Sequence, residues 1–186
     1  MSMRMPERWD AVQRGDRAAI ETMCRTWLPV VLQWTRRLGG PRVDADSATQ
    51  EVFIVALRRL HTVRAPEAFE RWLFSVTRRV LSQHRRAVWG RRWESDQQVD
   101  DMSGPANPEA DFTRMTQATQ IQEVVATLPE DLAAVLVLYD VEGRTMPEVV
   151  DMLGVSEGTL RTRLRSARAQ FRKVATKRGL IPEESK

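Results

Sequence analysis

The sequence predicts an all-α fold in which two small helical domains are joined by an acidic, flexible linker. Ala, Leu, Arg, Glu and Gln dominate the composition, and no run of β-branched residues alternates strictly with polar ones. Apolar residues recur at helical spacing in both halves of the chain. Between the halves, residues 94–111 are acidic and polar and contain one glycine and two prolines, a composition typical of a linker. We therefore expect domains over residues 1–93 and 112–178, followed by a tail over residues 179–186.

Four helices are expected in the first domain, over Pro6–Arg14, Asp16–Leu38, Asp44–Leu60 and Pro66–Arg92. Asp16 is a favourable N-cap, because its carboxylate can accept a hydrogen bond from an otherwise unpaired backbone N–H. Pro29 lies inside the second helix and should kink or split it. Pro66 suits the first turn of the fourth helix.

Two apolar stripes at helical spacing should face the core of this domain. The stripe of the third helix comprises Val52, Phe53, Ala56, Leu57 and Leu60. The stripe of the fourth helix comprises Phe69, Trp72, Leu73, Val76, Val80 and Leu81.

The second domain is expected to be a four-helix unit that ends in a helix-turn-helix. Its helices should cover Phe112–Thr127, Glu130–Val141, Met146–Leu153 and Ser156–Lys177. Gly154 permits a left-handed turn residue, Val155 can fill the angle between the helices, and Ser156 can cap the last helix. In that helix an apolar face recurs at steps of three and four, formed by Leu160, Leu164, Ala167, Phe171 and Val174.

Charge is unevenly distributed, although the net charge is only +4. Residues 71–93 hold seven arginines and no acid, residues 94–111 hold six acids and no base, and residues 158–180 hold eight bases and no acid. Ordinary solvated faces would explain isolated charges, but they explain less well why each block excludes the opposite sign. The pattern indicates two basic surfaces joined by an acidic strap.

Composition also argues against several other classes of protein. The one cysteine, Cys24, cannot form a disulfide within the chain, which favours a reducing cytosol, and it is expected to be a small buried apolar residue. With only His61 and His84 besides, no standard zinc site is expected. The start of the chain, MSMRMPERWD, lacks the apolar stretch of a secretion signal, and no apolar run could span a bilayer. We find no glycine-rich phosphate loop and no nucleophile elbow, so we expect no enzyme activity, no catalytic residue, no metal and no cofactor.

The basic face of the last helix, from Glu157 to Val174, is suited to DNA. The major groove accepts one α-helix, and residues near the N-terminus of that helix reach the base edges. Arginine can hold a guanine edge or a phosphate through two hydrogen bonds. The alternatives to DNA binding are that this basic helix is simply solvated, that it lies on a membrane surface, or that it binds an acidic partner. The glycine turn and the apolar register of this helix favour DNA binding.

Three stretches together resemble the extracytoplasmic-function sigma factors, which are small bacterial initiation factors with two helical domains. DADSATQEVFIVALRRL (Asp44–Leu60) resembles the acidic helix of the family, and FERWLFSVTRRVLSQHRR (Phe69–Arg86) resembles its aromatic and arginine-rich helix. LPEDLAAVLVLYDVEGRTMPEVVDMLGVSEGTLRTRLRSARAQFRK (Leu128–Lys173) is similar to nearly the whole C-terminal domain of the family. The stretches occur in the family's order and cover most of the chain.

The resemblance implies a role for each stretch. The acidic helix would dock on the coiled coil of the largest subunit of core RNA polymerase, through Asp44, Asp46, Gln50, Glu51 and Phe53. Asp44 could equally be an N-cap and Phe53 a core residue, and both could hold at once. The loop His61–Ala68 and the helix after it would bind the minus-ten element, where opened single strands are held by stacking and by charge. The residues implied there are His61, Trp72, Arg78, Arg79, Gln83, Arg85 and Arg86, although Trp72 also fits the core.

The last helix would read the minus-thirty-five element as duplex DNA. The residues implied are Glu157, Gly158, Thr159, Arg161, Thr162, Arg163, Arg165, Ser166 and Arg168. Arg79 stands where the family often has asparagine, and Glu157 and Gly158 include no strong base reader, so the promoter preference is not implied. The acidic linker would thread through polymerase as a mimic of nucleic acid.

The resemblance also implies partners and a location. The partners are core RNA polymerase, promoter DNA and a cognate anti-sigma factor that can be membrane-anchored, without membrane insertion of this chain. The location is cytoplasmic, at the nucleoid when active and at the inner membrane face when held by an anti-sigma factor. The alternative from the residues is a stand-alone helix-turn-helix regulator, but such a protein needs neither the acidic helix nor the aromatic and arginine-rich helix.

Overall fold

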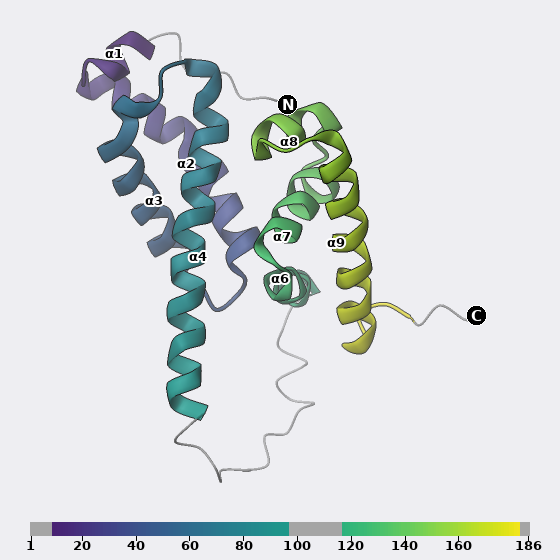
Figure 1. Cartoon of the computed structure of the whole chain (residues 1–186). Coiled ribbons are helices and arrows are strands. Elements are labelled where there is room, and N and C mark those ends of the chain that lie inside the picture. Colours follow the sequence, from purple (N-terminus) through teal and green to yellow (C-terminus); the bar gives the residue numbers. More distant parts are fainter. Residues whose placement is uncertain (1–8, 97–116, 183–186) are drawn as a thin grey trace.

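The computed structural model describes residues 9–96 and 117–182, and every regular element in these residues is helical (Figure 1). The first half contains α1 (Trp9–Gln13), α2 (Arg17–Gly39), α3 (Ala45–Arg59), two short 3₁₀ turns (Leu60–Thr62 and Pro66–Ala68) and α4 (Phe69–Asp96). The second half contains α6 (Gln117–Thr127), α7 (Glu130–Leu136), η3 (Val137–Val141), α8 (Met146–Leu153) and α9 (Glu157–Lys177). The all-α prediction is confirmed.

Side-chain caps set the beginnings of α2 and α3. The Asp16 carboxylate accepts a hydrogen bond from the Ala19 N–H at 2.8 Å, as predicted. Of the two effects predicted for Pro29, a kink or a split, the split is wrong, because α2 is one helix from Arg17 to Gly39. Trp27 and Val31 flank the proline and are fully buried. Their burial holds the helix together, because it outweighs the one backbone hydrogen bond that proline removes.

Aromatic rings from α2 and α4 form the centre of the first half. Trp27 packs edge-on against Phe69 with ring centroids 5.4 Å apart, and Trp34 packs edge-on against Phe74 at 4.9 Å. All four rings are at most 1% exposed. Large buried rings dominate core energetics, so this cluster fixes α4 against α2.

The predicted apolar stripes are mostly buried. The buried members are Val52, Ala56, Leu60, Phe69, Leu73, Val76, Val80 and Leu81, whereas Phe53 and Trp72 are half-buried against the core. Leu57 is 42% exposed, so its assignment to the core is wrong. α3 packs with a single narrow face, and Leu57 lies beyond the edge of that face. α4 buries Phe74 and Thr77 as well, because it is covered by α2 and α3 on one side and by α8 on another.

The second half matches the predicted helices with one change. The helix expected over Glu130–Val141 consists of α7 and a π-helical turn, η3, in which the Glu142 N–H donates to the Val137 carbonyl at 2.9 Å. A hydrogen bond that spans five residues widens the helix at this point. The predicted helix beginnings at Pro6 and Phe112 lie outside the described residues.

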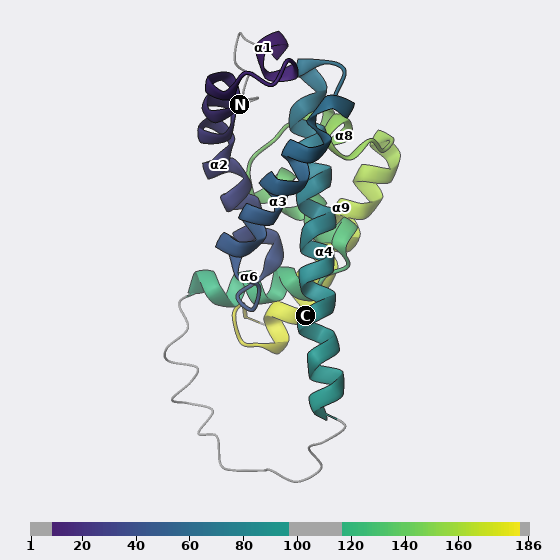
Figure 2. The ribbon, with the colours of Figure 1, turned by 90° about the vertical axis from the view of Figure 1, so that its left-hand side faces the viewer.

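The two halves pack side by side and share one continuous apolar core (Figures 1 and 2). α4 lies against α8, and α2 lies against α6. Of the predicted linker, Glu94–Asp96 belong to α4, and residues 97–111 lie outside the described part of the chain. None of the described helices has the length and hydropathy needed to cross a membrane.

Candidate nucleic-acid interface

The helix-turn-helix is formed by α8, a tight turn and α9. Thr145 and Glu148 form a reciprocal capping box at the start of α8, where the Thr145 N–H donates to the Glu148 carboxylate at 2.8 Å. This bond holds the pKa of Glu148 below its ordinary value. Gly154 then adopts a left-handed conformation with φ of 62°, as predicted, and Ser156 accepts a hydrogen bond from the Thr159 N–H at 3.2 Å. The turn therefore sets the direction of α9 through local bonds.

α9 packs with one face and leaves another open. Leu160, Leu164 and Ala167 are buried, and α9 lies on the side of the molecule away from α2–α4 (Figure 1). The open side chains comprise Glu157, Thr159, Arg161, Thr162, Arg165, Arg168 and Arg172, together with Gly158. A shallow groove along this face is lined by Arg161, Leu164, Arg165, Arg168, Ala169 and Arg172.

Acidic neighbours hold two of these arginines in place. Arg161 bonds Glu157 one turn earlier on α9, and Arg168 makes two bonds to Asp140, at 2.9 Å and 2.5 Å. Both guanidinium groups donate hydrogen bonds to these carboxylates, which raises the pKa of each above the ordinary value. Arg168 also lies 5.7 Å from the centre of the Tyr139 ring. Both guanidinium groups therefore stay charged and oriented toward solvent.

Two residues of the predicted duplex-binding set are placed differently. Arg163 points toward α7 and forms an ion pair with Asp131 at 2.7 Å, and its side chain is 29% exposed. Ser166 is half-buried on the edge of the open face. The open groove is thus centred on Arg161, Arg165 and Arg168.

Three arginines of α4, Arg71, Arg78 and Arg85, contact the second half of the chain. Arg78 Nε donates to Glu130 at 3.1 Å, and Arg78 Nη2 donates to Asp131 at 2.6 Å. Arg85 Nη2 donates to the Ala126 carbonyl at 3.2 Å. Burial lowers the pKa of Arg85, although the nearby charge of Glu130 opposes the change. Arg78 and Arg85 are therefore engaged by α6 and α7.

The remaining residues of the predicted minus-ten set are open to solvent or packed in the core. A hollow beside α4 is lined by Ser75, Arg78, Arg79, Ser82, Gln83, Arg86 and Glu130. His61 is exposed in the 3₁₀ turn after α3. The Trp72 ring packs against the Phe69 ring with centroids 5.8 Å apart, which supports its role in the core.

α3 presents the predicted polymerase-docking residues along one helix. Asp44 is its N-cap and accepts hydrogen bonds from the Asp46 and Ser47 N–H groups at 3.0 and 3.2 Å. The Ser47 hydroxyl and the backbone N–H of the same residue lower the pKa of Asp44. Asp46 and Gln50 are exposed, and Glu51 lies 2.7 Å from His84 Nε2 of α4.

The same helix carries an apolar surface that the sequence analysis did not identify. Ile54 and Leu57 are 51% and 42% exposed, and Phe53 is half-buried beside them. Phe53 and Leu57 belong to the predicted core stripe, because apolar side chains at helical spacing normally face inward, whereas Ile54 was assigned to no stripe.

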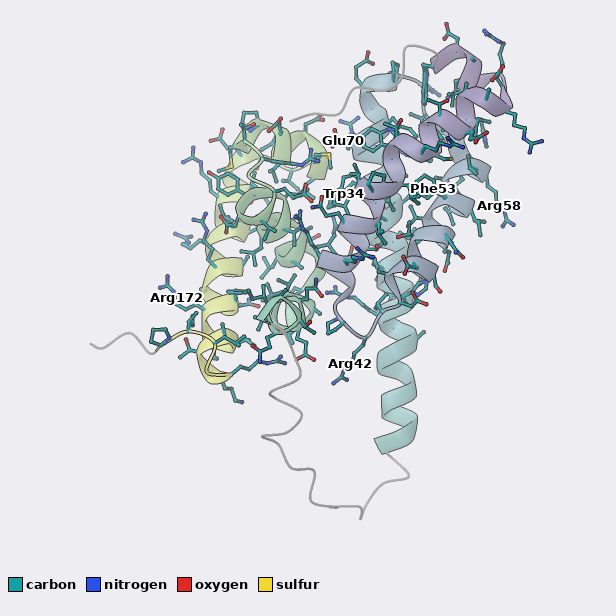
Figure 3. The ribbon with its side chains drawn as sticks, turned by 180° about the vertical axis from the view of Figure 1, so that it is seen from behind. Trp34, Arg42, Phe53, Arg58, Glu70 and Arg172 are labelled. Atoms are coloured by element: carbon teal, nitrogen blue, oxygen red, sulfur yellow. The ribbon has the colours of Figure 1, made fainter. Side chains whose placement is uncertain are left out.

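A second feature missed in the sequence is a charge network between the halves. Arg144 Nη2 bonds Glu70 at 2.6 Å and Arg144 Nε bonds Glu142 at 2.9 Å, while Arg37 bonds Glu142 at 3.2 Å. The side chains of Glu70, Glu142 and Arg144 are only 10–12% exposed. Burial opposes the charged form of Arg144, but the two carboxylates raise its pKa above the ordinary value. Figure 3 shows Glu70 directed toward the second half. These partners lie as many as 105 residues apart, so no local pattern reveals them.

Comparison with known families gives a consistent result for both halves. Residues 23–91 match the family model described as Sigma-70 region 2, and residues 118–171 match Sigma-70, region 4. The two matches together cover more than half of the chain, and they contain α3, most of α4 and the helix-turn-helix.

Curated relatives resemble the chain over most of its length. It is 31% identical over 163 residues to the ECF RNA polymerase sigma factor SigE of Mycolicibacterium smegmatis, an alignment that covers 85% of this chain and 63% of the relative. The chain therefore spans slightly less than two thirds of that protein. It is 27% identical over 168 residues to the RNA polymerase sigma-H factor of Pseudomonas aeruginosa, covering 86% of this chain and 87% of the relative.

Solved structures share the fold. CnrH, solved in complex with the cytosolic domain of CnrY, has a TM-score of 0.61 at 20% identity and covers 89% of this chain and 93% of its own. The sigma factor RpoE of Bartonella quintana, solved with the anti-sigma factor NepR, has a TM-score of 0.60 at 17% identity, with coverages of 84% and 96%. At this level of identity the likeness establishes a common architecture.

Proposed function

The chain belongs to the extracytoplasmic-function sigma factors of the sigma-70 family, and from this premise we propose that it directs core RNA polymerase to promoters. It would bind core polymerase, recognise the minus-thirty-five and minus-ten elements, and nucleate strand opening. Members of this family are initiation factors and not catalysts. Residues 1–93 would bind polymerase and the minus-ten element, and residues 112–178 would bind the minus-thirty-five element.

The open arginine face of α9 is the observation that carries this proposal. Arg161, Arg165 and Arg168 line one groove on a helix whose N-terminus is capped and exposed. Guanidinium groups in such a row match the phosphates and guanine edges of a major groove. Gly158, Thr159 and Thr162 would extend the contact, Glu157 would act by holding Arg161, and Arg163 and Ser166 would act at the edge of the contact.

The α4 hollow supports contact with an opened strand. Arg79, Gln83 and Arg86 supply charge and hydrogen bonds there, and Arg78 and Arg85 would join them once they are released from α6 and α7. His61 lies nearby in sequence on the preceding turn. Trp72 supports the helix from within the core and is not proposed as a stacking platform.

Polymerase would dock on α3. Asp46, Gln50 and the exposed apolar pair Ile54 and Leu57 offer a mixed polar and apolar surface. Asp44 caps the helix, and Glu51 is held by His84, so these two would contribute through position as well as contact. We also propose regulation by an anti-sigma factor, because the RpoE relative in fold was solved with one.

Transcription from a promoter fragment library with purified core polymerase tests the proposal. We expect transcripts that depend on this chain, and Arg165→Ala should reduce them at least severalfold because phosphate contact is lost. Arg25→Ala is the matched control, since it removes the same charge from an exposed pair on α2. Equal transcription by wild type and Arg165→Ala at every salt concentration would show that α9 is assigned incorrectly.

Co-purification with core polymerase tests the docking surface. Asp46→Lys should abolish binding, and Glu21→Lys on α2 should not, although both reverse an exposed acid. Tight promoter binding by the chain without polymerase would instead favour a stand-alone regulator.

A further inference from the structure

The two halves of the chain meet through complementary charge. Arginines of the first half face acids of the second half at three places, where Arg37 pairs with Glu142, Arg71 with Asp151, and Arg78 with both Glu130 and Asp131. One pair, Glu70 with Arg144, runs the other way. The basic side of α4 thus lies against an acidic side of the second half.

The most complete of these contacts is at Arg78. Its guanidinium is held from two directions at 3.1 and 2.6 Å, and its side chain is 21% exposed. Asp131 uses its other carboxylate oxygen to hold Arg163 of α9 at 2.7 Å. One carboxylate therefore joins an arginine of α4 to an arginine of α9.

We propose that the acidic first turn of α7, Glu130 and Asp131, is an intramolecular substitute for nucleic-acid phosphate that occupies Arg78 beside the hollow of α4. Single-stranded promoter DNA and this turn compete for the same guanidinium. The inference rests on the proposed function, because it assumes that α4 binds an opened strand.

Acids in a first helical turn have a simpler explanation, since the helix dipole favours them there. That explanation does not require Arg78 to lie within hydrogen-bond distance of both carboxylates. It also does not account for Glu130 in the lining of the hollow, together with Arg79, Gln83 and Arg86. A carboxylate in this lining repels phosphate as well as occupying Arg78.

A buried network holds the halves in this arrangement. Arg144 bridges Glu70 and Glu142 with little exposure to water, and Arg37 completes the cluster. A buried ion pair contributes little net stability but strongly disfavours arrangements that leave one charge unpaired. Close approach of Gly40 to Ala126 adds a steric element, because a Cβ at Gly40 would lie 2.5 Å from the Ala126 Cβ. The two halves therefore pack against each other in one specific arrangement, in which the second half covers Arg78 of α4.

Binding of a labelled single-stranded DNA pool to the full-length chain tests the proposal directly. Glu130→Gln with Asp131→Asn should tighten binding about three- to tenfold, because apparent affinity rises as the binding-competent fraction rises. Asp10→Asn with Glu21→Gln is the matched control, since it removes two exposed acids from α1 and α2 and corrects for net charge. An equal gain in both double variants would overturn the proposal.

Arg78→Ala completes a mutant cycle. In the wild-type background this substitution removes a DNA contact, which lowers affinity for single-stranded DNA, and it removes the residue that the acids hold, which favours release of the second half. These two effects oppose each other, so the net change in affinity should be small. In the Glu130→Gln, Asp131→Asn background it should remove the whole gain. Additive effects in the two backgrounds would show that Arg78 and the acidic turn act independently, which contradicts the proposal.

A distance measurement tests closure separately from DNA function. With Cys24→Ala removing the one native cysteine, dyes on Arg58→Cys and Lys173→Cys report the separation of α3 and α9, both positions being exposed. Saturating single-stranded DNA should increase the distance between the dyes. If this distance did not change, the second half would not be displaced by DNA, which contradicts the proposal. Failure of transcription with core polymerase, alongside a positive cycle and a distance change, would instead refute the proposed function and leave the intramolecular contact intact.

Discussion

α4 and α9 carry the same chemistry but differ in what surrounds it. Each is an arginine-rich helix, and each follows a turn, but α4 is packed on two sides and α9 on one. The arginines of α9 at positions 161, 165 and 168 line an open groove, whereas Arg78 and Arg85 of α4 are held by α7 and α6. The difference arises because α9 lies at the outer edge of the second half, whereas α4 lies in the first half, where it packs against the second (Figure 1). Accessibility is therefore decided by tertiary placement and not by the helix itself.

Among the substitutions that should expose α4, removal of Arg144 is expected to have the largest effect on stability. Arg144→Ala takes the guanidinium away from two carboxylates that are 10–12% exposed. Loss of one partner from a buried pair costs about 3–5 kcal/mol, because charge stays buried without compensation. We expect a large fall in the urea midpoint, compared with Arg25→Ala, whose exposed pair should matter by less than about 1 kcal/mol. Similar midpoints for the two variants would show that the network does not hold the halves together.

The turn after α2 offers a second way to uncover α4. Gly40 and Gly15 both have positive φ, of 77° and 83°, so alanine is strained at both positions, by about 1–3 kcal/mol at Gly40, whose ψ of 171° places it in a region almost exclusive to glycine. Only Gly40→Ala also meets Ala126 of α6, and overpacking should add roughly 1–3 kcal/mol. Gly15→Ala has open space around it and serves as the control. Equal free energies of unfolding in the two variants would contradict close packing of α2 on α6.

Features that depend on neighbouring residues could be predicted from the sequence, whereas contacts between distant residues could not. Asp16, Gly154 and Ser156 were identified correctly because a cap bonds residues within one turn. Leu57 was misassigned because spacing shows that a residue lies on an apolar stripe but not how wide the packed face is. The charge network could not be foreseen, since Arg37 and Glu142 lie 105 residues apart.

The candidate sites divide in the same way. The arginine face of α9 follows from periodicity within one helix, so the sequence could indicate most of it. Arg163 has the same composition signal as its neighbours, yet it turns to Asp131 of α7. Glu130 and Asp131 read as ordinary first-turn acids, and only the folded chain brings Arg78 to them.

Substitution of the N-cap of α9 tests whether local hydrogen bonds, and not contacts with the first half, stabilise the first turn of this helix. Ser156→Ala removes the acceptor for the Thr159 N–H and should cost about 1 kcal/mol, whereas Ser156→Asp should restore most of it. Promoter-duplex binding should weaken with the alanine variant in proportion to the fraying of the first turn. The distance between α3 and α9 should stay the same, because no contact between the halves is lost. A change in that distance would mean that the two helices are less independent than the structure indicates.

The smallest effect is expected at the first turn of α9, where an acid holds a DNA-facing arginine within one helix. Glu157→Gln frees Arg161, whose side chain is 68% exposed, so the free energy of unfolding should not change measurably and duplex affinity should rise less than about threefold. The same kind of substitution at Asp131 and Glu130 should have the larger effect on single-stranded DNA, because those acids hold Arg78 across an interface that must open. Anisotropy titrations of both variants on both forms of DNA make the comparison. If Glu157→Gln increased affinity as much as the interface variant, exposure alone would explain both, and covering of α4 by the second half would be unnecessary.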